Sequence, residues 1–114
     1  MDEELTAAEV RALRDFWQHL YRGVRCLIML EGTIQERLAD AFVEVGRLDP
    51  QVLPPGIGGR YERLLDVMKS GKPTMGEGIY PAAALALSTD QAKDHASEIL
   101  AMFQVVSTAL ERHR

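Results

Sequence analysis

Three carboxylates offer the most direct chemistry in this sequence. Glu36, Asp40 and Glu44 are spaced by four residues, so they would lie along one face of a helix. Hard divalent cations prefer carboxylate oxygens as ligands, and Glu31 lies shortly before the row. As one alternative, the row therefore predicts a metal-dependent hydrolase in a helical bundle. The other interpretation is a solvated helix face, which the nearby Arg37 favours.

A second set of residues combines an arginine, a histidine and a tyrosine. In Arg14, His19 and Tyr21, four residues separate the first two and one residue separates the last two. This spacing resembles the motif of the HEPN-type ribonucleases, which are small all-helical dimers. The resemblance implies that Arg14 holds the scissile phosphate, His19 moves a proton and Tyr21 supports the site. The alternative is that Arg14 and His19 face solvent, in which case replacing His19 with alanine would leave thermal stability almost unchanged.

Neither the histidine near the C-terminus nor the single cysteine predicts a reactive site. His95 and Glu98 are three residues apart, and Asp94 precedes them. Di-iron bundles use the opposite order, with glutamate before histidine, and repeat it on a second helix. We therefore expect His95 to be a partly buried, hydrogen-bonded residue. The apolar neighbours of Cys26 predict an inert, buried thiol.

The composition is that of a globular protein. Of the 114 residues, 46% are hydrophobic and 26% are charged, and the formal net charge of -4 disfavours a dedicated nucleic-acid binder. Four arginines could still form a basic strip on one helix, although such a strip is usually a solvated face. They are Arg11, Arg14, Arg22 and Arg25. The chain shows no signal peptide and no apolar run long enough to cross a bilayer, so we expect a cytoplasmic protein.

Helices must position these side chains, because the apolar residues repeat at alternating intervals of three and four. Two long stripes follow this rule. The first contains Val10, Leu13, Trp17, Leu20, Val24 and Leu27 and resumes at Ile34, Leu38, Ala41 and Val45; the second contains Ala92, Ala96, Ile99, Phe103, Val106 and Leu110. No segment alternates as a strand would. We therefore predict an all-α fold, a three- to four-helix antiparallel bundle with long first and last helices.

Capping signals and breakers set the expected helix boundaries. Thr6, Thr33 and Ser88 each begin a capping box, and Gly32 interrupts the first stripe. Without a break at Gly32, one continuous helix would be about 58 Å long, too long for a monomeric domain of this size. Either the helix breaks there, which we favour, or it protrudes and pairs with another subunit. We predict a single domain over residues 1–114, with helices near 6–31, 33–47, 60–70 and 88–112 and loops at 48–59 and 71–80. Glu31 would either lie exposed at the break or set the register of a helical seam.

The strongest signals in the sequence concern packing. The apolar stripes exceed what the short middle helices can cover, so we predict a homodimer that pairs through the heptad faces. The leading functional hypothesis is a non-catalytic helical interaction or regulatory module that self-associates. The RNA-cleaving enzyme and the metal-dependent hydrolase remain alternatives. We expect no cofactor and no membrane contact, and we favour a protein over a nucleic acid as the partner.

Overall fold

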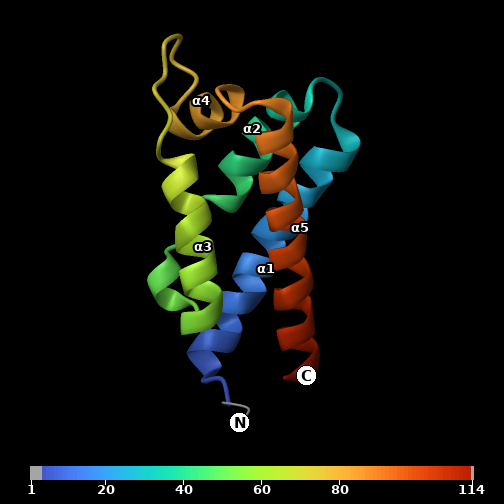
Figure 1. Cartoon of the computed structure of the whole chain (residues 1–114). Helices are drawn as coiled ribbons and strands as arrows, with labels where there is room; N and C mark the ends of the chain where they lie inside the picture. Colours follow the sequence, from blue (N-terminus) through green and yellow to red (C-terminus); the bar gives the residue numbers. More distant parts are fainter. Residues whose placement is uncertain (1–3, 114) are drawn as a thin grey trace.

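Five α-helices form a bundle in the computed structural model, which describes residues 4–113 (Figure 1). They are α1 (Ala7–Met29), α2 (Ile34–Val45), α3 (Pro55–Met68), α4 (Ile79–Leu85) and α5 (Thr89–Arg112), with a short 3₁₀ turn, η1, at Pro50–Val52. Within residues 4–113 there is no strand, so the predicted all-α class is confirmed.

The bundle is elongated and measures 44 × 25 × 20 Å. Helices α1 and α3 run toward one end, and α2 and α5 run back from it (Figure 1). The short helix α4 lies across that end, whereas the start of α1 and the end of α5 lie at the opposite one (Figure 1). In the described part of the chain, no helix combines the length and the apolarity needed to cross a membrane.

Hydrogen bonds at the first turn explain where three of the helices begin. Thr6, Thr33 and Ser88 each accept from the backbone amide three residues further on, and the side chain of that residue accepts from the cap amide in return. The backbone and side-chain hydrogen bonds from Thr33 lower the pKa of Glu36. All three residues are the N-caps that the sequence predicted, so these helix starts are confirmed.

The chain reverses direction between α1 and α2. Gly32 has a φ of 111°, which lies in the left-handed region that favours glycine. Nη1 of Arg37 donates to the carbonyl oxygen of Leu27 at 2.7 Å and thereby satisfies one of the free carbonyls at the end of α1. The predicted break is therefore confirmed, and the continuous helix is excluded. Glu31 lies exposed in this turn, as one of its two alternatives required.

The apolar stripes meet inside a single chain. The members of the stripes that are fully buried are Leu13, Leu20, Leu38, Ala41, Val45, Ala92, Ile99 and Val106. Trp17, Val24 and Phe103 are half-buried against this core. Because the stripes cover each other, a dimer through the heptad faces would have to open the fold. Self-association stays a prediction, but it must use other surfaces.

Two aromatic residues of the core pack against each other. Phe16 is fully buried, and its ring centroid lies 4.6 Å from that of Tyr61 on α3. The Tyr61 hydroxyl donates to the carbonyl oxygens of Val45 (2.7 Å) and Leu48 (2.9 Å), and burial raises its pKa. The buried face of α1 thus includes Phe16, which lies outside the heptad pattern. A helix that packs against several neighbours buries a wider stripe than a two-helix seam does.

Helix α3 begins earlier than predicted. Pro55 occupies its first position, where the missing amide loses no hydrogen bond, and the glycines that follow continue the helix. Gly58 lies so close to Pro50 that an added Cβ would be 2.9 Å from its carbonyl oxygen. The loop predicted at 48–59 therefore consists largely of η1 and the first turn of α3. The loop predicted at 71–80 is correct up to residue 78, because α4 begins at Ile79.

Gly23 allows α1 and α2 to approach each other closely. A Cβ at this position would lie 2.6 Å from Cγ2 of Val45 and 3.6 Å from the carbonyl oxygen of Ala41. We expect Gly23→Ala to lower the free energy of unfolding by about 1–3 kcal/mol, because the two helices would have to separate. Chemical denaturation measures this change.

The matched control is Gly59→Ala in α3. A Cβ at Gly59 would meet nothing within 4 Å. Helix propensity alone then predicts a gain of about 0.5–1 kcal/mol in the free energy of unfolding. Equal effects of the two substitutions would contradict the close helix contact at Gly23.

Candidate functional site

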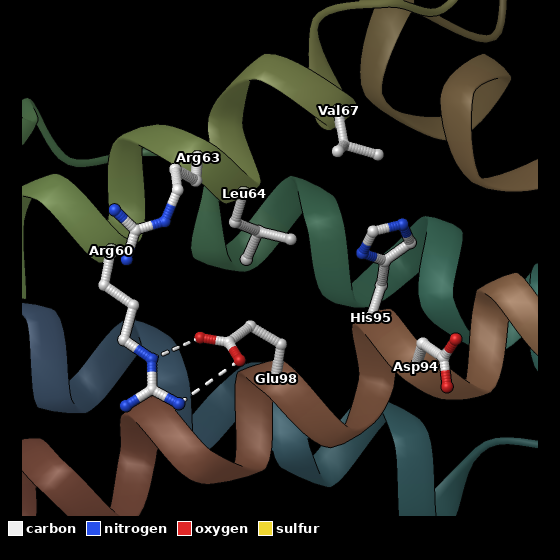
Figure 2. A pocket seen from close by; sticks show the side chains of 7 residues that line it. All are labelled: Arg60, Arg63, Leu64, Val67, Asp94, His95 and Glu98. Atoms are coloured by element: carbon white, nitrogen blue, oxygen red, sulfur yellow. Dashed lines mark hydrogen bonds and ion pairs between the residues drawn. The ribbon is translucent and has the colours of Figure 1, made fainter.

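A cleft of about 610 Å³ opens between α3 and α5 (Figure 2). Its lining residues are Arg60, Arg63, Leu64, Val67, Asp94, His95 and Glu98. The first four belong to α3 and the last three to α5, so one wall supplies arginines and the other supplies carboxylates. This volume falls within the range of small-molecule sites, and the cleft gathers five ionisable side chains. We therefore take it as the candidate site.

An ion pair joins the two walls of the cleft. Nε of Arg60 donates to Oε1 of Glu98, and Nη2 donates to Oε2 at 3.2 Å, which makes the contact bidentate (Figure 2). The hydrogen bond to Glu98 raises the pKa of Arg60. The two side chains are 34% and 33% exposed, so water screens part of their attraction. The pair nevertheless holds the guanidinium in a defined position.

The α5 wall of this cleft consists of residues that the sequence singled out without predicting a site, and the α3 wall was not predicted at all. His95 and Glu98 both line the cleft, and His95 is half-buried as predicted. The hydrogen bond expected for His95 is absent among residues 4–113. Arg60 and Arg63 were not among the candidates. Their spacing of three residues, which places both on one helix face, is the signal that could have indicated them.

Arg14, His19 and Tyr21 have different neighbours within one chain. Arg14 lines a separate hollow of about 370 Å³ beside Trp17. The Tyr21 ring stacks on Trp17, with the centroids 5.3 Å apart and an interplanar angle of 4°. His19 points its Nε2 toward Oδ1 of Asp15, at 3.8 Å, on the same helix. An RNA-cleaving site would therefore need a second subunit to bring Arg14 and His19 together.

The carboxylate row of α2 does not converge on one point. Glu36 completes the capping box with Thr33, and Glu44 lies 3.7 Å from Arg47. Asp40 is exposed between them. Among residues 4–113, no three histidine, cysteine or acidic side chains lie close enough to hold a metal ion. The metal-dependent alternative thus has no assembled site in the described chain.

Cys26 lies half-buried on α1, between charges of both signs. Burial raises the pKa of its thiol, and the nearby carboxylates of Asp40 and Glu44 raise it further, whereas Arg25 lowers it. A raised pKa keeps the thiol protonated and therefore weakly nucleophilic. This agrees with the inert thiol that the sequence predicted.

Known proteins do not indicate what the cleft binds, since no family model, no curated protein and no solved structure matches this chain. A helical bundle by itself does not indicate a function either, because such folds support many unrelated activities. The chemistry of the surface and the cleft must therefore be inferred from their own geometry.

The Arg60–Glu98 pair should contribute a modest coupling energy of about 0.5–1 kcal/mol, because it is bidentate but partly exposed. Arg60→Gln, Glu98→Gln and the double variant form a thermodynamic cycle that urea denaturation can measure. Arg63→Gln is the matched control, since Arg63 makes no ion pair among residues 4–113. A coupling of zero would show that the pair does not connect α3 to α5 in solution.

His19 is more buried than the sequence predicted. Only 14% of its side chain is exposed, and in the described chain its buried Nδ1 has no hydrogen-bond partner. The expectation that His19 faces solvent is therefore wrong. The buried face of α1 extends past the heptad positions and reaches this side chain.

Replacing His19 should consequently reduce stability. We expect His19→Ala to lower the free energy of unfolding by about 1–2 kcal/mol, because the smaller side chain leaves packed space empty. Thermal denaturation provides the measurement, with Gln18→Ala as the control at an exposed position of the same helix. If both variants melt at the wild-type temperature, His19 is not packed as described.

Proposed function

We propose that the protein is a non-catalytic helical interaction module that self-associates through the outer face of α1 and α2. One observation carries the proposal: this face places a row of arginines beside a row of carboxylates. The heptad residues are unsuitable as a contact surface, since Leu13, Leu20 and Ile99 are fully buried within the chain. The contact must therefore use residues that a single chain leaves exposed.

The arginine row lies on the solvent side of α1. All four arginines are exposed, and within residues 4–113 none of them forms an ion pair. The members of the row are Arg11, Arg14, Arg22 and Arg25. At the rise of an α-helix the row is about 21 Å long. The guanidinium of Arg25 also lies over the ring of Tyr21, 6.0 Å from its centroid.

The carboxylate row lies next to the arginines, on α2. Asp40 is exposed, whereas Glu44 is half-buried, with 25% of its side chain exposed, and lies 3.7 Å from Arg47 in an ion pair. Both carboxylates are close enough to Cys26 on α1 to raise its pKa, and Arg25 is close enough to lower it. Charges of opposite sign therefore flank Cys26, positive on α1 and negative on α2.

A two-fold contact would place each arginine row against the carboxylate row of a second copy. An isologous contact uses the same surface on both subunits, and a face with both signs side by side is complementary to itself. Each exposed ion pair contributes only about 0.2–1 kcal/mol. Met29, which is 67% exposed and lies one turn after Arg25, adds apolar area. We expect a Kd of about 1–100 µM that rises with salt.

Variants with exchanged charges test the proposed contact. One variant carries Arg22→Glu and Arg25→Glu, and the other carries Asp40→Arg and Glu44→Arg. Sedimentation of the wild-type chain at about 100 µM and low salt should give a weight-average mass of about 1.5 to 2 times the chain mass. Each variant alone should be monomeric, and an equimolar mixture of the two should dimerise. In either variant alone, like charges face each other across the contact. In the mixture, opposite charges face each other on both halves of it, as in the wild type.

The control exchanges charges elsewhere. Glu62→Arg combined with Asp66→Arg alters two exposed carboxylates of α3 and should dimerise like the wild type. A monomeric wild-type chain would disprove self-association. If both exchanged variants still form a dimer, the contact lies on another surface. A dimer that cleaves single-stranded RNA, and loses this activity on Arg14→Gln, would favour the RNA-cleaving alternative instead.

A further inference from the structure

We propose that the cleft between α3 and α5 binds a monocarboxylate with an apolar body. This ligand site is independent of self-association, because it is built by other helices. The lining side chains divide the cleft into three parts (Figure 2). The two guanidinium groups and the Glu98 carboxylate gather at one end, Leu64 lies in the middle, and Val67, His95 and Asp94 lie toward the other end.

The guanidinium end of the cleft has one positive charge in excess. Glu98 neutralises Arg60 through two hydrogen bonds. Arg63 lies one turn further along α3, is exposed, and forms no hydrogen bond or ion pair among residues 4–113. One incoming carboxylate would balance the charge of Arg63 through charge-assisted hydrogen bonds.

The ion pair between Arg60 and Glu98 also prepares the site. A free arginine side chain loses much rotamer freedom when it binds a ligand. Here the bidentate contact with Glu98 already restricts the Arg60 guanidinium in the empty cleft. A ligand bound to Arg63 therefore has to order only the Arg63 side chain, because Arg60 beside it is already held in place during folding.

The middle of the cleft requires an apolar ligand body. Leu64 belongs to the core and is 3% exposed, whereas Val67 is half-buried. Figure 2 shows Leu64 between the guanidinium groups and the imidazole of His95, and Val67 on the α3 wall opposite that imidazole. Neither side chain can form a hydrogen bond, so a polar group placed over them would lose its contacts with water without compensation. A short chain of methylenes suits this position.

The far end of the cleft disfavours a second negative charge. Asp94 is exposed on α5, and its carboxylate would repel a second acid group of the ligand. A phosphate monoester, with a charge of about −1.5 to −2 at neutral pH, would exceed the single excess charge that Arg63 supplies. A dicarboxylate or a phosphate ester is therefore a poorer match than a monocarboxylate.

Calorimetric titration with three six-carbon ligands tests this specificity. Hexanoate carries one negative charge, 1-hexanol carries none, and hexyl phosphate carries nearly two. We expect hexanoate to bind the full chain with a Kd of about 1 mM or tighter, and both analogues to bind about tenfold more weakly. Arg63→Gln should weaken hexanoate binding about tenfold, because it removes the charge-assisted hydrogen bonds.

The control variant is Arg112→Gln, which removes a positive charge from the far end of α5 and should leave hexanoate binding unchanged. Circular dichroism verifies that Arg63→Gln is folded, which we expect because Arg63 is exposed and unpaired among residues 4–113. Equal binding of hexanoate and 1-hexanol would show that the cleft does not recognise a carboxylate. Tighter binding of hexyl phosphate, no binding of hexanoate at about 10 mM, or binding that survives Arg63→Gln would each overturn the proposal.

Discussion

Between Met29 and Ile34 the chain turns back on itself, and the remainder of the fold depends on this reversal. Gly32 adopts the required backbone conformation, and Arg37 satisfies a carbonyl that the end of α1 would otherwise leave free. Once α2 lies against α1, their apolar sides cover each other, and α5 covers much of what remains. In an unbroken helix, the apolar heptad residues would need a second subunit to cover them. The helix hairpin covers them within one chain instead.

The same reversal determines which charges meet on the surface. Since the apolar sides of α1 and α2 face inward, their polar sides point outward next to each other. Arg25 and Asp40 are distant in the sequence, but both lie near enough to Cys26 to affect its pKa. The face that we propose for self-association is therefore a product of the helix hairpin and belongs to neither helix alone. Contacts built on such exposed charges are weak and sensitive to salt, which suits reversible association.

The cleft between α3 and α5 has a comparable origin. Its two walls join through the Arg60–Glu98 ion pair, and the cleft remains open beside that pair. Leu64 serves both the core and the cleft, so the apolar middle of the site is as well ordered as the core itself. A partly exposed ion pair beside an open, partly apolar space can recognise a ligand with a charged and an apolar part.

The sequence by itself determined the helical class and the three capping boxes, because each depends on residues within one or two turns. It also placed His95 and Glu98 on one face of a helix for the same reason. It favoured a break at Gly32 but left a continuous helix open, and the structure decided for the break. Only the tertiary structure decided that Phe16 is fully buried, that His19 is largely covered, and that the Arg60 side chain reaches Glu98. These features depend on how helices far apart in the sequence pack together, and periodicity within one helix carries no information about its neighbours.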